Sequence, residues 1–434
     1  MLFISTRDAH HRVGFSQALS QGMAADGGLY VPEAWPATAM QALQAGEPLA
    51  RLAAKFLAPF VAGDVLAPEL PSIATEAFNF AAPLTPLDGD RLSVLELYHG
   101  PTAAFKDFGA RFLAAALKRL PGAAGKPLKI LVATSGDTGG AVAAAFHRQP
   151  GVEVVILFPK GKVSPTQQQQ LTCWGDNVLS LAVRGSFDDC QRLVKQAFVD
   201  PAMTAQWALS SANSINLGRL LPQAVYYVAA SLAIREQTGG SASFVIPSGN
   251  LGNATACVWA RRLGAPIEEI VLAHNANRTV PDYLLEGVVR VRPSVATLAS
   301  AMDVGSPSNL ERLTALYPDA AALGIALSAV AIDDNAIRAR IRSDYQRYAV
   351  IWCPHTAAAA EAWAQLETAH RKRCHWVLVA TAHPAKFREI VEPLIGQPVP
   401  VPETLLRLFG RPAHFIEIES TLAALCAALK GQPA

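Results

Sequence analysis

From about residue 92, short runs of β-branched and other apolar residues alternate with longer runs rich in alanine and leucine. Strands that alternate with helices favour parallel sheets covered by helices on both faces. In such sheets, ligands bind where strands end and loops lead into helices. The short runs predict strands at 128–133, 152–158, 178–183, 243–247, 270–273 and 376–380. Helices are predicted after 106, from about 140, and near 166–172, 188–198, 254–263 and 386–394.

Residues 1–85 show a different pattern. The first residues are mostly polar, and prolines interrupt the short helical patterns that follow. We therefore expect a smaller N-terminal region at 1–85. Two α/β core domains are expected at 86–210 and 211–434, with a ligand cleft between them. Three loops that end predicted strands, at 134–140, 248–253 and 381–386, are the first places to look for a site.

Composition limits the class of protein further. Hydrophobic residues make up 51% of the 434 residues and charged residues 17%, which favours a large core over disorder. Lysine plus arginine against aspartate plus glutamate gives 37 − 35 = +2, so charge predicts neither a nucleic-acid nor a membrane partner. The apolar run 224–234 is shorter than the roughly 20 residues that span a bilayer and is predicted to form a buried helix. The six scattered cysteines indicate reduced thiols and no metal site. We expect a soluble, cytoplasmic protein.

Lys106 is the first candidate for chemistry. It ends a turn that contains Gly100 and Pro101, and an apolar helix follows it. Asp107 suits the first turn of that helix. Burial beside apolar side chains disfavours the ammonium, lowers the amine pKa and makes the amine a better nucleophile toward an aldehyde. Taken alone, the pattern favours a surface lysine that happens to start a helix.

Two glycine-containing turns, each between a predicted strand and a helix, are candidates for anion binding. The turn at 134–140 adds hydroxyls to its backbone N–H groups, and the turn at 248–253 adds two asparagines. Neither is GxGxxG or a P-loop, so a dinucleotide or a nucleoside triphosphate is not favoured. Asn213, Ser214 and Arg219 form a second possible phosphate clamp. Each is also compatible with an ordinary turn or helix cap. The glutamines 167–170 are predicted to form a solvated helix face.

Six motifs resemble those of the threonine synthases, pyridoxal-phosphate enzymes of fold type II, the fold shared with the tryptophan synthase β-subunit. The motifs are HGPTAAFKDFG (99–109), ATSGDTGGAV (133–142), NSINLGR (213–219), PSGNLGN (247–253), AMDVGSPSN (301–309) and TAHPAKF (381–387). The resemblance runs over nearly the whole chain. It implies conversion of O-phosphohomoserine and water to L-threonine and phosphate, by β,γ-elimination and β-addition of water. It also implies a pyridoxal 5'-phosphate cofactor, a small-molecule substrate and a monomer or homodimer.

The resemblance assigns roles position by position. Lys106 matches the lysine that carries the cofactor as a Schiff base and moves protons. The match extends to the cofactor-phosphate loop (Gly249, Asn250, Leu251, Asn253) and to the hydroxyl that bonds the pyridine nitrogen (Thr381). It also covers the substrate-carboxylate loop (Thr134, Ser135, Asp137, Thr138) and the substrate-phosphate clamp (Asn213, Ser214, Arg219). Leu251 stands where phenylalanine is more usual. Asp137 replaces an asparagine that bonds the cofactor 3-oxygen in some relatives, so its role is open.

Three alternatives can be weighed against this interpretation. A related lyase of the same fold would release a 2-oxo acid and ammonia from the same substrate. A non-catalytic homologue would bind the cofactor as a regulator, but the presence of Lys106, Ser214 and Arg219 speaks against it. A nicotinamide dehydrogenase would fit the α/β pattern, but the chain lacks GxGxxG.

Overall fold

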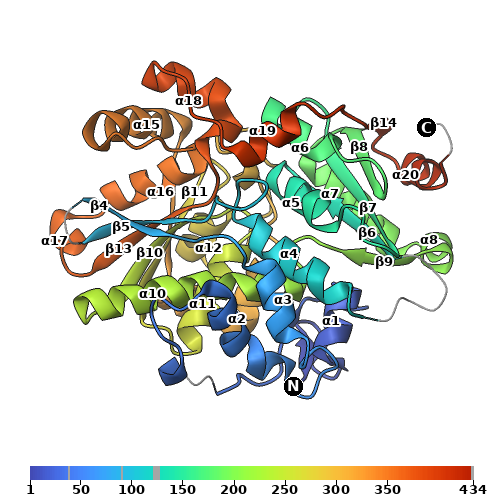
Figure 1. Cartoon of the computed structure of the whole chain (residues 1–434), viewed down its shortest axis with the longest axis horizontal. Coiled ribbons are helices and arrows are strands. Elements are labelled where there is room, and N and C mark those ends of the chain that lie inside the picture. Colours follow the sequence, from blue (N-terminus) through green and yellow to red (C-terminus); the bar gives the residue numbers. More distant parts are fainter. Residues whose placement is uncertain (38–39, 89–90, 121–127, 432–434) are drawn as a thin grey trace.

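Two large sheets, each covered by helices, form the body of the protein (Figure 1). The computed structural model describes residues 1–431 except 38–39, 89–90 and 121–127. The six-stranded sheet has the order β12-β11-β10-β13-β5-β4, parallel except for its antiparallel β4–β5 pair. Its strands are β4 (Leu84–Asp88), β5 (Leu92–Glu96), β10 (Ala242–Pro247), β11 (Ile267–His274), β12 (Ser328–Ala331) and β13 (His375–Ala380).

The five-stranded sheet has the order β14-β8-β7-β6-β9 and is parallel throughout. Its strands are β6 (Leu128–Ala133), β7 (Val152–Pro159), β8 (Val178–Arg184), β9 (Ala208–Ser211) and β14 (Ile416–Glu419). The chain thus returns to this sheet near its C-terminal end, while β4 and β5 belong to the other sheet. The predicted ranges 86–210 and 211–434 therefore do not each coincide with one sheet, and the domain boundaries stay a prediction.

The N-terminal region contains a small antiparallel sheet, which the sequence patterns did not predict. Its strands are β1 (Phe3–Ser5), β2 (Arg12–Val13) and β3 (Tyr30–Pro32). These strands could not be recognised from the sequence, because two or three residues are too few to show the alternation of apolar and polar positions. The buried guanidinium of Arg312 donates to the carbonyl of Tyr30 at 3.1 Å, which joins this sheet to the body of the protein.

The helices cover the sheets and fill the space between them. They are α1 (Phe15–Gln21), η1 (Met40–Ala42), α2 (Leu49–Leu57), η2 (Ala58–Val61), α3 (Leu70–Ala77), α4 (Lys106–Leu117), α5 (Asp137–Phe146), α6 (Pro165–Thr172), α7 (Phe187–Val199), α8 (Pro201–Gln206), α9 (Leu217–Leu220), η3 (Leu221–Gln223) and α10 (Ala224–Thr238). There follow α11 (Gly252–Arg262), α12 (Thr279–Glu286), η4 (Ser300–Met302), α13 (Leu310–Leu316), α14 (Ala320–Ala326), α15 (Asp334–Tyr348), α16 (Pro354–Ala364), α17 (Thr368–Arg371), η5 (Pro384–Phe387), α18 (Arg388–Ile395), α19 (Glu403–Phe409) and α20 (Leu422–Leu429).

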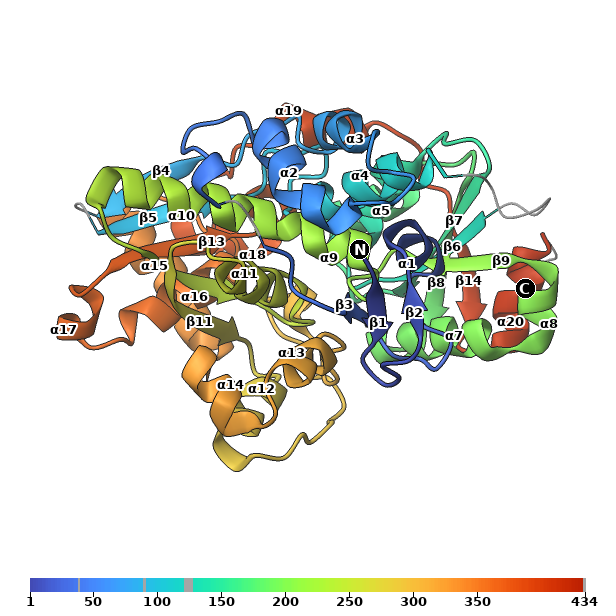
Figure 2. The same cartoon turned by 90° about the horizontal axis from the view of Figure 1, so that it is seen from below.

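Helix α10 runs along the large sheet, and its first turns are buried (Figure 2). Val225, Tyr226, Tyr227 and Val228 are all 0% exposed. The stretch Leu217–Thr238 is long and apolar enough to cross a membrane by length and composition, but 83% of its apolar window is buried inside the protein. The prediction of a buried helix at 224–234 is therefore confirmed.

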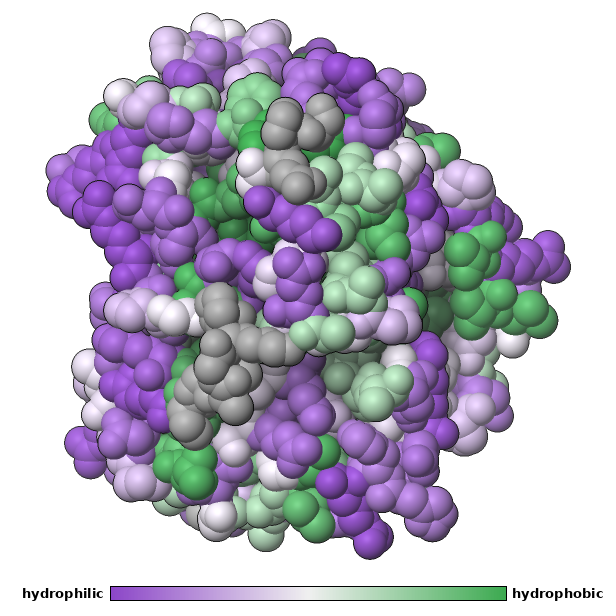
Figure 3. All heavy atoms as spheres, turned by 90° about the vertical axis from the view of Figure 1, so that its right-hand side faces the viewer, coloured by the Kyte–Doolittle hydropathy of each residue, from purple (hydrophilic) through white to green (hydrophobic). Residues whose placement is uncertain are grey.

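The predicted parallel α/β architecture is also confirmed. Strand β6 has the predicted bounds, and the other predicted strands and helices differ by a few residues at their ends. On the side that carries β9, α8 and α20, hydrophobic residues stand in small groups separated by hydrophilic ones (Figure 3).

Candidate active site

The three predicted loops meet in one cavity between the two sheets. Each follows the carboxyl end of a parallel strand: β6, β10 and β13. Its empty volume, which includes the part open to solvent, is about 660 Å³. The predicted site residues that line it are Lys106, Thr134, Ser135, Asp137, Thr138, Asn213, Ser214, Gly249, Asn250, Leu251, Asn253 and Thr381. Phe105, Phe187, Met302, Val304 and His355 are among the other lining residues.

Lys106 is the first residue of α4, and the turn before it anchors it to the large sheet. The N–H of Phe105 donates to the carbonyl of Thr381 at 2.8 Å, so the lysine lies beside the end of β13. Its Nζ lies 4.4 Å from the centre of the Phe105 ring. Burial lowers the pKa of the Lys106 amine to about 8, and Arg219 and Lys386 act in the same direction against Asp137. The predicted lowering of this pKa therefore has a structural cause.

This lowered pKa predicts how the full-length protein without cofactor takes up pyridoxal phosphate. Only the neutral amine attacks an aldehyde, so the uptake rate should rise with pH and level off above about 8. An ordinary lysine would give a rate that still rises near pH 10. Stopped-flow absorbance at a series of pH values measures the midpoint. A midpoint near that of an ordinary lysine would contradict the burial of this amine.

The loop after β6 is shaped by Thr134. Its Oγ1 accepts hydrogen bonds from the N–H groups of Gly136 at 3.0 Å and Gly139 at 2.9 Å. This turn places Ser135 and Thr138 on the cavity wall at the N-terminus of α5. Hydroxyls at a helix N-terminus suit a carboxylate, because backbone N–H groups and the helix dipole favour an anion there.

Asp137 is buried and has two side-chain partners. Its Oδ1 lies 2.8 Å from Nζ of Lys386 and accepts from Nε2 of Gln167 at 2.9 Å. Burial opposes ionisation of this carboxyl, but Lys386 and Gln167 hold its pKa below the usual value. Asp137 is therefore a carboxylate at neutral pH.

The prediction that residues 167–170 form a solvated face is wrong. Gln167 is 0% and Gln170 1% exposed. Gln167 binds Asp137, Gln170 donates to the carbonyl of Thr102 at 2.9 Å, and Gln169 donates to the carbonyl of Leu408. Helix α6 lies against α5 and η5, so tertiary packing buries polar side chains that the local pattern would leave in water.

The loop after β10 leaves no room for a side chain at Gly249 and leads into the N-terminus of α11. Gly249 packs against the backbone of η4, where an added Cβ would lie 2.6 Å from Cα of Met302. Leu251 has a left-handed backbone, with φ 60°, and starts α11 without a side-chain cap. Asn253 holds the turn by donating to the carbonyl of Pro247 at 2.9 Å. Helix N-terminal N–H groups without a side-chain cap are suited to a phosphate.

Asn213 and Ser214 lie directly beside this loop. The Ser214 hydroxyl accepts from the amides of Asn250 at 2.9 Å and Asn309 at 3.1 Å. The Asn213 amide donates to the carbonyl of Ala133, the last residue of β6, at 2.6 Å. The predicted phosphate clamp at 213–214 and the predicted anion turn at 248–253 are thus neighbours, joined by the Asn250–Ser214 hydrogen bond.

Arg219 is the one predicted site residue that does not line the cavity. It is 1% exposed, and its guanidinium donates to the carbonyl of Ala212, just before Asn213. Burial lowers its pKa to about 10 against the pull of Asp107, so it stays a cation at neutral pH. Its place is behind the 213–214 loop, near Lys106.

His355 lines the cavity, although nothing in the sequence pattern singled it out. Its Nε2 accepts a hydrogen bond from the N–H of Ala301 at 3.0 Å, so this nitrogen carries no proton. Burial lowers its pKa to about 4, which keeps the ring neutral. His355 therefore holds η4 against Gly249. An isolated histidine at the start of an Ala-rich helix carries no local signal of this contact.

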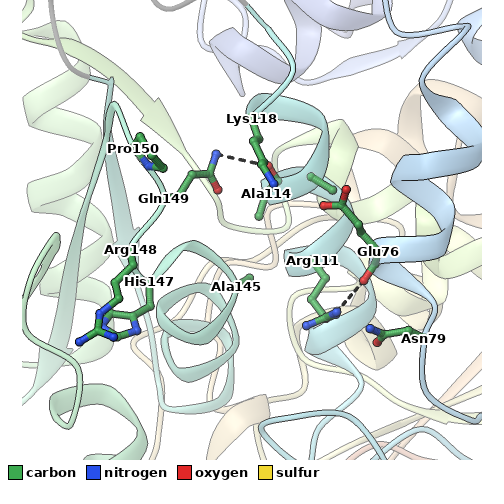
Figure 4. Close-up of a pocket in the computed structure, with 11 residues that line it drawn as sticks. Glu76, Asn79, Arg111, Ala114, Lys118, Ala145, His147, Arg148, Gln149 and Pro150 are labelled. Carbon is green, nitrogen blue, oxygen red and sulfur yellow. Dashed lines mark hydrogen bonds between the residues drawn. The ribbon is translucent and has the colours of Figure 1, made fainter.

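A second cavity lies on the other side of α4 and contains none of the predicted site residues (Figure 4). Arg111 and Glu76 lie on one side of it, and His147 and Arg148 on the other, with Ala145 between. The two arginines do not point to a common centre, so these residues do not form an anion site.

The fold and the first cavity together define a class of enzyme. An amine with a lowered pKa, an uncapped helix N-terminus and a hydroxyl at a strand end, on parallel sheets, suit a cofactor that carries an aldehyde, a phosphate and a ring nitrogen. These are the features of a pyridoxal-phosphate-dependent enzyme. The family model described as "Pyridoxal-phosphate dependent enzyme" matches residues 80–382. Models described as the N terminus and the C-terminal part of threonine synthase match 2–78 and 356–428.

The chain belongs to the threonine synthase family. It is 39% identical to threonine synthase of Haemophilus influenzae over 433 residues, which cover 99% of each chain. It is 37% identical to the Escherichia coli enzyme over 427 residues, 98% of each chain. The solved E. coli structure has a TM-score of 0.91 and covers 99% of this chain and 100% of its own. The PLP-bound threonine synthase from Brucella melitensis has a TM-score of 0.89 at 34% identity, with coverages of 100% and 99%.

Proposed function

We propose that this protein converts O-phosphohomoserine and water to L-threonine and phosphate. The observation that carries the proposal is the placement of the Lys106 amine in one cavity with the loops 134–138, 213–214 and 249–253. One cavity therefore offers a place for each of two phosphates, one carboxylate and one transferable proton.

The cofactor would be held at three points. Residues 249–253 and the N-terminus of α11 would hold its phosphate, Lys106 would bind its aldehyde, and the Thr381 hydroxyl would bond its ring nitrogen. When bound, pyridoxal phosphate supplies the electron-withdrawing group that stabilises negative charge at the substrate α carbon. A hydroxyl is a weaker proton donor than a carboxylic acid or a cation, so Thr381 favours an unprotonated ring nitrogen.

The substrate is held at its two charged ends. Ser135 and Thr138, with the N-terminus of α5, bind the carboxylate. Asn213 and Ser214 bind the phosphate, and the buried cation of Arg219 lies behind them. This arrangement sets the distance between the carboxylate and the phosphate and therefore selects a substrate that carries both groups.

Lys106 moves the protons. Its amine takes the α proton, serves the β and γ carbons in turn as phosphate leaves and water adds, and returns a proton to the α carbon. A pKa of about 8 places the amine close to neutral pH, where it can both accept and donate protons. The burial of the cavity between the two sheets limits the access of bulk water to these steps.

A product assay tests the reaction. With O-phosphohomoserine as the substrate, we expect equal amounts of L-threonine and phosphate and no 2-oxobutyrate. The related lyase activity would give 2-oxobutyrate, ammonia and phosphate. Phosphate release with 2-oxobutyrate as the main product would therefore replace the proposal with the lyase.

We also propose a localisation, an oligomeric state and partners for the enzyme. We infer a cytoplasmic enzyme that acts on a small molecule as a monomer or homodimer, without nucleic acid or membrane. The net charge of +2 and the buried position of the apolar stretch at 217–238 support this. Analytical ultracentrifugation of the purified protein measures the oligomeric state.

A further inference from the structure

Lys386 is a fully buried cation that the proposed reaction does not use. It lies in η5, directly after the Thr381 loop, and its side chain is 0% exposed. It is not among the residues that line the cavity. Its Nζ lies 2.8 Å from Oδ1 of Asp137 and donates to the carbonyl of Thr102 at 2.9 Å. Lys386 thus stands behind Asp137, out of reach of a ligand.

Three separate parts of the site meet at this amine. Thr102 belongs to the turn that leads into Lys106, Asp137 begins α5 at the carboxylate loop, and Lys386 follows the strand end that carries Thr381. Helix α6 adds a second donor to each acceptor, Gln167 to Asp137 and Gln170 to the Thr102 carbonyl. The Ser164 hydroxyl in turn donates to the Lys386 carbonyl at 2.8 Å.

The charges around Lys106 act in opposite directions. Arg219 from α9 and Lys386 from η5 disfavour its ammonium, and Asp137 from α5 favours it. Asp107, the next residue of α4, binds the N–H and hydroxyl of Thr102, and His355 from α16 is neutral. Without Lys386, the carboxylate of Asp137 would lose its direct ion-pair partner, and less positive charge would oppose its effect on the reactive amine.

We propose that Lys386 is a positioning residue for Lys106: it balances the charge of Asp137 and, through the Thr102 carbonyl, fixes the turn from which Lys106 enters the cavity. This rests on the proposed function. Its consequence is that the positive charge of Lys386 opposes the effect of the Asp137 carboxylate, which by itself raises the pKa of Lys106. The test needs only the cofactor and no substrate, so it stays meaningful whatever product the assay above finds.

The test is the pH profile of pyridoxal phosphate uptake by the full-length protein freed of cofactor. Lys386→Met leaves Asp137 without its counter-charge, so the midpoint should rise by about one pH unit, the effect of a nearby opposite charge. Lys386→Arg keeps the charge and should keep the wild-type midpoint. The double variant Asp137→Asn/Lys386→Met removes both charges and should return the midpoint toward the wild-type value.

The matched control is Lys118→Met, which removes one positive charge from an exposed position at the other end of α4 and should leave the midpoint unchanged. Melting temperatures of all variants are measured alongside. A Lys386→Met protein that melts earlier but keeps the wild-type midpoint overturns the proposal, because a purely structural role would behave in that way. An equal shift in Lys386→Arg overturns it as well, since charge would then not be the cause.

If Lys386→Met fails to fold, Asp137→Asn alone decides. It leaves the Lys386 cation unbalanced, so the midpoint should fall below that of the wild type. An unchanged or raised midpoint in a folded Asp137→Asn protein would refute the charge balance.

Discussion

Replacement of Lys106 by alanine should lower kcat by about 10⁴-fold, the upper end for a general acid–base group, because one amine serves several proton transfers. The visible absorption band of imine-bound pyridoxal phosphate should also be lost. Lys106 lines the cavity, whereas Lys386 is fully buried behind Asp137 and does not line it. Initial rates of phosphate release and an absorption spectrum measure both effects.

Lys118→Ala is the control for this loss. It lies on the exposed end of the same helix and should keep the wild-type rate within about twofold, as surface substitutions usually do. Added methylamine should restore part of the Lys106→Ala activity, because a free amine can enter the space that the side chain leaves. A Lys106→Ala protein that keeps the absorption band or a tenth of the activity would show that another amine carries the cofactor.

Replacement of Gly249 by alanine should weaken cofactor binding strongly. The added Cβ would lie 2.6 Å from Cα of Met302 and 3.1 Å from its carbonyl carbon. These are backbone atoms, and the hydrogen bond from Ala301 to His355 holds them in place. Overpacking of this kind costs about 1–3 kcal/mol, which corresponds to roughly 5- to 150-fold in the Kd of pyridoxal phosphate. A fluorescence titration of the cofactor-free protein measures it.

Gly324→Ala is the matched control. Gly324 lies inside α14 with open space around the position of a new Cβ, so alanine should leave the Kd unchanged. Alanine there should raise stability by up to about 1 kcal/mol, because it is the better helix former. Wild-type cofactor affinity in Gly249→Ala would show that the phosphate lies elsewhere than on the 249–253 loop.

The loops that carry the site could be predicted because their signals are local. In 128–133 and 243–247, apolar runs end abruptly at glycine and hydroxyl residues, so both the strand and its carboxyl-end loop could be read from a short window. The fold class then required that these ends face a common cleft. The structure places both loops on the wall of one cavity.

Other residues could not be predicted because their environment comes from distant parts of the chain. Gln167 and Gln170 read as a polar face but are buried against Asp137 and the Thr102 carbonyl. Met302 lies against Gly249, and His355 binds the N–H of Ala301 beside it; both come from segments more than 50 residues away in the sequence. Arg219 was expected in the cavity, yet it binds the Ala212 carbonyl behind it.

The amino-acid sequence by itself predicted most strands and helices of the two large sheets, a candidate reactive lysine and the loops suited to anions. Each of these depends on backbone preferences and side-chain types within a few neighbouring residues. Only the tertiary structure decided which polar groups are buried and which charges lie close together, above all the Asp137–Lys386 pair behind Lys106. The reason is physical: desolvation and charge–charge interactions depend on distances in space, and the packing of the two sheets sets those distances.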